Sequence, residues 1–192
     1  TLLLTPFLDR YSPANQTTAI AAYKTRGYTH WKLWWPDSRD GNGQSEDQFV
    51  ATMQLLQANG LYPVPFLYAK GFDAVNPDIT KNDSLITKMI AGGVAQIACI
   101  GGELDLFNTP GATLQTLITH VADQLVPAGC LCYVHFSEGY VAWQAPGDLG
   151  SAFWSANVGK LTGILHQKKL CWDDGMYQAR LADLIVRFGT GV

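Results

Sequence analysis

Two glutamates, Glu103 and Glu138, stand where the chain leaves predicted buried strands. Residues 96–107 read QIACIGGELDLF, an apolar run followed by two glycines and the acids Glu103 and Asp105. Residues 131–139, LCYVHFSEG, repeat the pattern and reach Glu138. Parallel strands covered on both faces are almost continuously apolar, and in α/β proteins ligands bind at their carboxyl ends. A solvated acidic turn after each strand is the alternative explanation.

Two carboxyl groups that face each other across a cleft can cleave glycosidic bonds. One protonates the leaving oxygen, and the other acts as base or nucleophile. We assign these roles to Glu103 and Glu138, respectively. Further acids, aromatic rings and an amide near strand ends are predicted to bind the substrate: Asp9, Trp35, Tyr68, Asp105, Tyr140, Trp143 and Gln167. Packing between helices and strands is the alternative role for the tryptophans.

Strand-like and helix-like segments alternate along the whole chain. Strands are predicted at residues 1–8, 30–36, 61–69, 96–107, 131–139 and 161–167. Helices are predicted between them and at residues 177–188, and Ser45 with Gln48 has the spacing of a capping box. Such alternation predicts parallel strands with the helices outside. No composition shift marks a boundary, so residues 1–192 are predicted to form one domain.

The missing nucleotide motif favours a TIM-type (β/α) barrel over a doubly wound sheet. The first strand continues into LDRYSPAN, without the glycine-rich turn of a dinucleotide site, and no P-loop pattern occurs. Complete barrels have about 250 residues, whereas this chain has 192 and six clear strands. Either the barrel is incomplete, or residues 169–172 add a reduced seventh strand, or the chain is part of a longer protein.

Composition excludes several classes of partner. The chain is 47% hydrophobic with a formal net charge of −3, which suits a globular core and gives no basic surface for nucleic acid or an anionic membrane. No apolar run approaches the roughly 20 residues of a membrane span, and no signal-peptide pattern is seen. No metal or other cofactor is expected, because the histidines lack metal-ligand spacing. His120 is expected to be solvated on a helix, and the cysteines are expected to be buried free thiols: Cys99, Cys130, Cys132 and Cys171.

The run GGELDLF, followed by a helix and then CYVHFSEGY and WQAPGD, resembles two groups of proteins. One is the glycoside-hydrolase-like barrels that carry a glutamate at the fourth strand. The other is the barrel domains of tailed-bacteriophage structural proteins. The resemblance implies a virion or extracellular protein that binds or degrades a surface glycan, with other virion chains as partners.

One departure leaves catalysis open. Many retaining barrel glycosidases have an Asn-Glu pair at strand four and a second glutamate at strand seven. Here Gly102 precedes Glu103, and no glutamate follows Glu138. A non-catalytic glycan-binding or virion module is therefore the alternative to a hydrolase, and an isomerase or lyase that uses the same acids is a third class.

Overall fold

The structure, a computed structural model, describes residues 13–34, 45–67, 78–100, 111–136, 160–166 and 182. These residues form an α/β fold with one five-stranded parallel sheet. The elements in chain order are α1 (Pro13–Thr25), β1 (His30–Trp34), α2 (Glu46–Ala58), β2 (Tyr62–Leu67), α3 (Asp83–Ala91), β3 (Ile97–Ile100), α4 (Gly111–Leu125), the 3₁₀ turn η3 (Val126–Ala128), β4 (Leu131–Phe136) and β5 (Gly163–His166).

Local sequence signals account for these elements. Five of the six predicted strands are confirmed over their described residues, and their predicted continuations at 35–36, 68–69, 101–107, 137–139 and 167 lie outside the described residues, as does the predicted strand at 1–8. Gly27 and Gly60 follow α1 and α2 at positive φ values of 80° and 74°, which glycine adopts without steric cost. The predicted helix at 151–158 lies outside the described residues, as does the one at 177–188 apart from residue 182.

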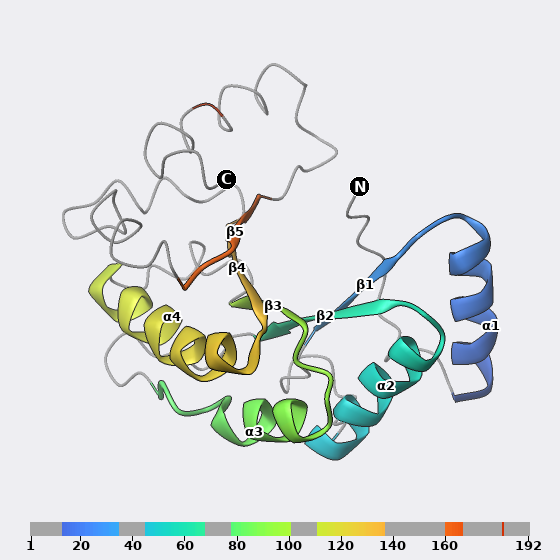
Figure 1. Cartoon of the computed structure of the whole chain (residues 1–192), viewed down its shortest axis with the longest axis horizontal. Helices are drawn as coiled ribbons and strands as arrows, with labels where there is room; N and C mark the ends of the chain where they lie inside the picture. Colours follow the sequence, from blue (N-terminus) through green and yellow to red (C-terminus); the bar gives the residue numbers. More distant parts are fainter. Residues whose placement is uncertain are drawn as a thin grey trace.

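The strands lie in the order β1-β2-β3-β4-β5, so every connection moves across the sheet in the same direction. A doubly wound sheet reverses this direction and places helices on both faces. Right-handed crossovers that keep one direction place their helices on one face, and α1 to α4 lie in an arc along one side of the strands (Figure 1). In the described part of the chain the sheet is therefore singly wound.

The two faces of the sheet carry separate apolar clusters. The main core joins the helices to one face, through residues such as Trp31 and Leu33 of β1 and Ile100 of β3. On the opposite face, here called the inner face, Val64, Phe66 and Cys99 form a second buried cluster, with Ile97 packed against it. Because side chains alternate along a strand, the two clusters assign the described side chains of β1 to β4 to a face.

Two prolines lie inside β2, where a missing N–H would normally break a ladder. Tyr62 donates its N–H to the Thr29 carbonyl on the β1 side, so the nitrogens of Pro63 and Pro65 face β3. The β2–β3 ladder pairs only Phe66 with Cys99 and Leu67 with Ile100. Both prolines therefore precede the residues that pair in the β2–β3 ladder, which begins at Phe66.

The predicted capping box at the start of α2 is confirmed. Ser45 Oγ accepts from the Gln48 N–H at 3.2 Å, and Gln48 Oε1 accepts from the Ser45 N–H at 2.9 Å. Ser45→Ala is expected to lower the free energy of unfolding by about 1 kcal/mol, because one N–H at the helix start loses its acceptor. Urea denaturation measures the change. Ser45→Asp, which restores an acceptor, should recover most of it, and equal stabilities of the alanine variant and the wild type would contradict the role.

Candidate functional site

The carboxyl ends of all five strands lie along one edge of the sheet, here called the carboxyl edge. Because the strands are parallel and in register, their last residues lie at the same end: Trp34, Leu67, Ile100, Phe136 and His166. In α/β barrels and open parallel sheets, this is the edge at which ligands bind. The carboxyl edge is therefore the candidate site.

All nine predicted site residues lie outside the described residues: Asp9, Trp35, Tyr68, Glu103, Asp105, Glu138, Tyr140, Trp143 and Gln167. In sequence, Trp35, Tyr68 and Gln167 come directly after β1, β2 and β5. Glu103 comes three residues after the end of β3, and Glu138 two residues after the end of β4. Their assigned roles stay predictions.

The two strands that precede the glutamates are neighbours, as predicted. β3 pairs with β4 in parallel, with Cys99 opposite Tyr133 and Ile100 opposite Val134. Cys99 belongs to the inner face, whereas Val134 belongs to the helix-side core. Glu103 and Glu138 each come four residues after these two positions, so the two glutamates follow residues of opposite faces.

The inner face carries a cation that the sequence interpretation missed. Lys32 is half-buried in the middle of β1, and its Nζ lies 4.1 Å from the centroid of the Phe66 ring. A signal for it was present: in HWKLW, Trp31 and Leu33 are core residues, so alternation sends Lys32 to the opposite face. A lysine there is unlike its apolar neighbours and marks a polar position on the inner face.

The described cysteines are buried free thiols, as predicted, and Cys171 lies outside the described residues. Burial raises the pKa of the Cys99 thiol well above its usual value, and the positive charge of Lys32 opposes this shift. Cys130 shares a hydrogen bond with Cys132, which raises the pKa of the Cys130 thiol and lowers that of Cys132. Because no part of Cys99 or Cys132 is exposed, neither is placed to act as a nucleophile.

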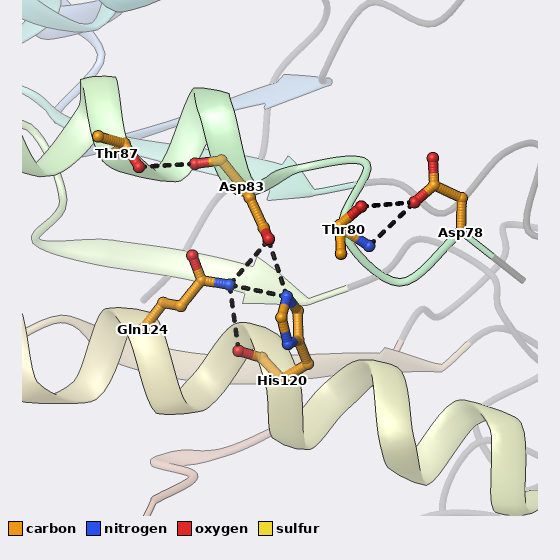
Figure 2. Close-up of polar contacts among 6 residues, drawn as sticks. All are labelled: Asp78, Thr80, Asp83, Thr87, His120 and Gln124. Carbon is orange, nitrogen blue, oxygen red and sulfur yellow. Dashed lines mark hydrogen bonds and ion pairs between the residues drawn. The ribbon is translucent and has the colours of Figure 1, made fainter.

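The prediction of a solvated His120 is met only in part: the side chain keeps 30% of its surface exposed, but it also contacts a neighbouring helix. Figure 2 shows that the His120 ring on α4 faces Asp83 at the start of α3, with Nε2 2.8 Å from Asp83 Oδ1. Gln124 donates to the same oxygen at 2.8 Å. The partners are 37 and 41 residues apart in sequence, so no local pattern could indicate them. The contacts join two helices of the outer layer, and we interpret the cluster as structural.

A second group of polar contacts lies just before α3. Asp78 Oδ1 accepts from the Thr80 N–H at 3.1 Å and from the Thr80 hydroxyl at 2.8 Å (Figure 2). Within α3, the Thr87 hydroxyl donates to the Asp83 carbonyl at 2.9 Å. These bonds organise the approach to α3 and its first turn, and they satisfy local backbone groups.

Two further features are absent from the part of the chain that the structure describes. No group of three or more His, Cys, Asp or Glu side chains in those ranges could hold a metal ion. No helix among them is long and apolar enough to cross a membrane.

Comparison with solved structures relates the fold to TIM barrels of carbohydrate-active enzymes and sugar epimerases. One of two fungal β-1,4-galactanases aligns with a TM-score of 0.54 and 12% identity, over 78% of this chain and 55% of that chain. A chitinase from Chromobacterium violaceum aligns with a TM-score of 0.53 and 9% identity, over 90% and 57%, respectively. A D-allulose 3-epimerase from Methylomonas sp., in complex with D-allulose, aligns with a TM-score of 0.54 and 17% identity, over 95% and 79%.

These similarities concern the fold, because the identities are low. The chain spans little more than half the length of the galactanase and the chitinase, at 55% and 57%. No family model matches the sequence, and no curated protein matches it. The comparisons give no support to the bacteriophage context, which stays a prediction from the resemblance.

Proposed function

We propose that this chain is a carbohydrate-active domain of the (β/α)-barrel type, complete or partial, that binds a glycan at the carboxyl edge and hydrolyses it. Glu103 acts as the general acid and Glu138 as the base or nucleophile. The observation that carries the proposal is the singly wound parallel sheet, which directs five carboxyl ends to one edge. The galactanase and chitinase folds add support, since both proteins act on polysaccharides by name.

The face assignment of β3 supports Glu103. Cys99 lies on the inner face. Glu103 comes four residues later, and in a chain that keeps strand alternation two residues four positions apart lie on the same side. In a barrel, inward-pointing residues at the carboxyl ends of the strands lie next to the site. Glu103 is therefore the acid that we expect to point into the cleft.

Glu138 needs an additional condition, because it comes four residues after Val134, a residue of the helix-side core. Glu138 can face the same cleft as Glu103 only if the chain departs from strand alternation after Phe136, where β4 ends. A retaining pair of carboxyl groups lies about 5–5.5 Å apart and an inverting pair about 6.5–9.5 Å. The separation would therefore also predict the stereochemical outcome.

The experiment that tests the proposal is incubation of the purified chain with β-1,4-galactan, chitin oligosaccharides and a panel of bacterial surface glycans. New reducing ends are measured together with direct binding. Hydrolysis of any member that is lost in a Glu103→Gln and Glu138→Gln double variant supports the proposal. Binding without cleavage supports the second candidate, and neither binding nor cleavage of any member contradicts both.

The second candidate is a non-catalytic glycan-binding module, in a virion or another extracellular setting. The observations that favour it are Gly102 directly before Glu103, where many retaining barrel glycosidases have Asn, and the helix-side position of Val134, four residues before Glu138. An isomerase would instead interconvert free sugars. D-Allulose, the ligand named for the epimerase neighbour, is the probe for that outcome, with the epimer measured by chromatography.

A further inference from the structure

The edge of the sheet opposite the candidate site, here called the amino edge, has a hollow lined by exposed apolar side chains. In the part of the chain that the structure describes, the exposed large apolar side chains are Tyr62 (48%), Ile90 (39%) and Leu131 (47%), and all three line this hollow. Its volume is about 360 Å³, in the range of small-ligand sites. Single exposed apolar residues are ordinary on a protein surface, whereas several around one concavity indicate a binding site.

The hollow is built on the first residues of three neighbouring strands. Tyr62, Ile97 and Leu131 begin β2, β3 and β4, and Ile97 is the register partner of Leu131. Ile90, near the end of α3, adds to the apolar lining. Residues at the amino ends of barrel strands usually serve stability. Side chains that stay about half exposed bury little surface in the core, so stability alone does not account for Tyr62 and Leu131.

Tyr62 presents its ring as a platform. The ring stacks on that of His30, with the centroids 5.0 Å apart and the planes 25° apart. His30 lies on β1 and does not line the hollow. Ile97 of β3 and Leu131 of β4 do line it, so the hollow extends from Tyr62 away from β1. The ring is therefore held by His30 on the β1 side and is open to a ligand on the β3 side.

The lining is polar in places but uncharged. Every described residue that lines the hollow has a neutral side chain. Gln96 is exposed there and offers an amide donor and acceptor, and Tyr62 adds a hydroxyl. Gly93 and Gly129, at φ values of 69° and 82°, leave open space where a side chain would otherwise project. The hollow thus combines an aromatic platform, neutral hydrogen-bonding groups and an open wall.

We propose that this hollow is a second, non-catalytic site that binds a neutral pyranose ring of a glycan, stacked on Tyr62. The uncharged lining gives no preference for an ionic ligand. A pyranose has an apolar C–H face for the aromatic ring and hydroxyls for the Gln96 amide. A protein partner fits less well, because the hollow has nine described lining residues and a stable protein interface takes about 20–30 a side.

The inference rests on the proposed function for the class of ligand, but it concerns a separate place. Tyr62 and Leu67 are the first and last residues of β2, so the two edges lie about 17 Å apart along this strand. A disaccharide therefore occupies one edge at a time. We expect the amino edge to hold a polymeric or surface-attached glycan and to leave the cleavage of a short one unchanged.

Amide NMR of the whole chain tests the site, with β-1,4-linked disaccharides of galactose and of N-acetylglucosamine as ligands. We expect one of them to shift the amide signals of Gly93, Gln96 and Gly129, and to leave that of Gly27, which follows α1, unchanged. Tyr62→Ala should weaken this binding about five- to tenfold, the effect of losing an aromatic contact. Tyr62→Phe keeps the ring and should bind within about twofold of the wild type.

A blocking variant gives a second readout, which also serves should Tyr62→Ala not fold. Ala128→Trp places a large side chain at an exposed position in the hollow and should abolish the shifts. Ala21→Trp, at an exposed position on α1, is the matched control and should leave them unchanged.

Four outcomes would overturn the inference. Unshifted signals of Gly93 and Gly129, with glycan binding or cleavage elsewhere on the chain, would remove the amino-edge site and leave the proposed function intact. Shifts that persist unchanged in Tyr62→Ala and Ala128→Trp would place the ligand outside the hollow. Dimers in sedimentation that Ala128→Trp abolishes, without any shift by sugar, would assign the hollow to an interface between copies. Failure to bind or cleave any glycan would overturn the proposed function and this inference together.

Discussion

Glu103→Gln is expected to lower the rate of glycosidic cleavage by about 10²- to 10⁴-fold, the usual contribution of a general acid or base. Glutamine has nearly the same shape but carries no transferable proton, so the leaving oxygen would depart without protonation. The measurement is kcat and KM on a glycan that the wild type cleaves. We expect kcat to fall with little change in KM, because the amide still fills the site.

Glu138→Gln, measured beside it, separates two roles for the second glutamate. As nucleophile or base, Glu138 should give a loss of the same order. Val134, four residues before Glu138, lies on the helix side of the sheet, so Glu138 could instead be a solvated residue outside the cleft. In that case the substitution should lower the cleavage rate by less than about threefold. Glu46→Gln is the matched control: Glu46 begins α2 and binds Lys88 at 3.1 Å in the helix layer, so the rate should be unchanged. A Glu103→Gln variant as active as the wild type would remove Glu103 from the mechanism.

Phe49→Ala is expected to lower the free energy of unfolding by about 3–5 kcal/mol, the range for removing a buried aromatic ring. Phe49 lies on α2 with no exposed surface, in the core between the helices and the sheet. The loss combines the transfer of the ring to water in the unfolded state with the cavity left in the core. An effect of this size is comparable with the whole stability of many domains.

Urea denaturation followed by circular dichroism measures this change, with the slope m compared between variants. Ala51→Gln, at an exposed position on the same helix, is the control and should change stability by less than about 0.5 kcal/mol. A loss below about 1 kcal/mol for Phe49→Ala would contradict the enclosure of the ring. An equal loss in the Ala51 control would mean that α2 tolerates no substitution, whatever its burial.

Sequence patterns predicted the elements that depend on neighbouring residues. The capping box at Ser45 and the glycines after α1 and α2 marked helix limits through local hydrogen bonds and backbone sterics. The apolar runs of β1 to β5 marked strands, because burial on both faces leaves few polar positions. The parallel direction followed from the alternation of strands and helices, since each strand must return across the sheet.

Only the tertiary structure decided which side chains meet across the fold. The strand order excluded the doubly wound alternative for the described residues, a matter of how crossovers stack rather than of any local motif. The contact of the partly exposed His120 with Asp83 was not predicted, because Asp83 lies on another helix. The position of Lys32 over Phe66 depends on the β1–β2 register, which pairs residues 32 positions apart. The sequence alone therefore determined the kinds of element and their order, whereas pairing, faces and partners were decided by long-range packing.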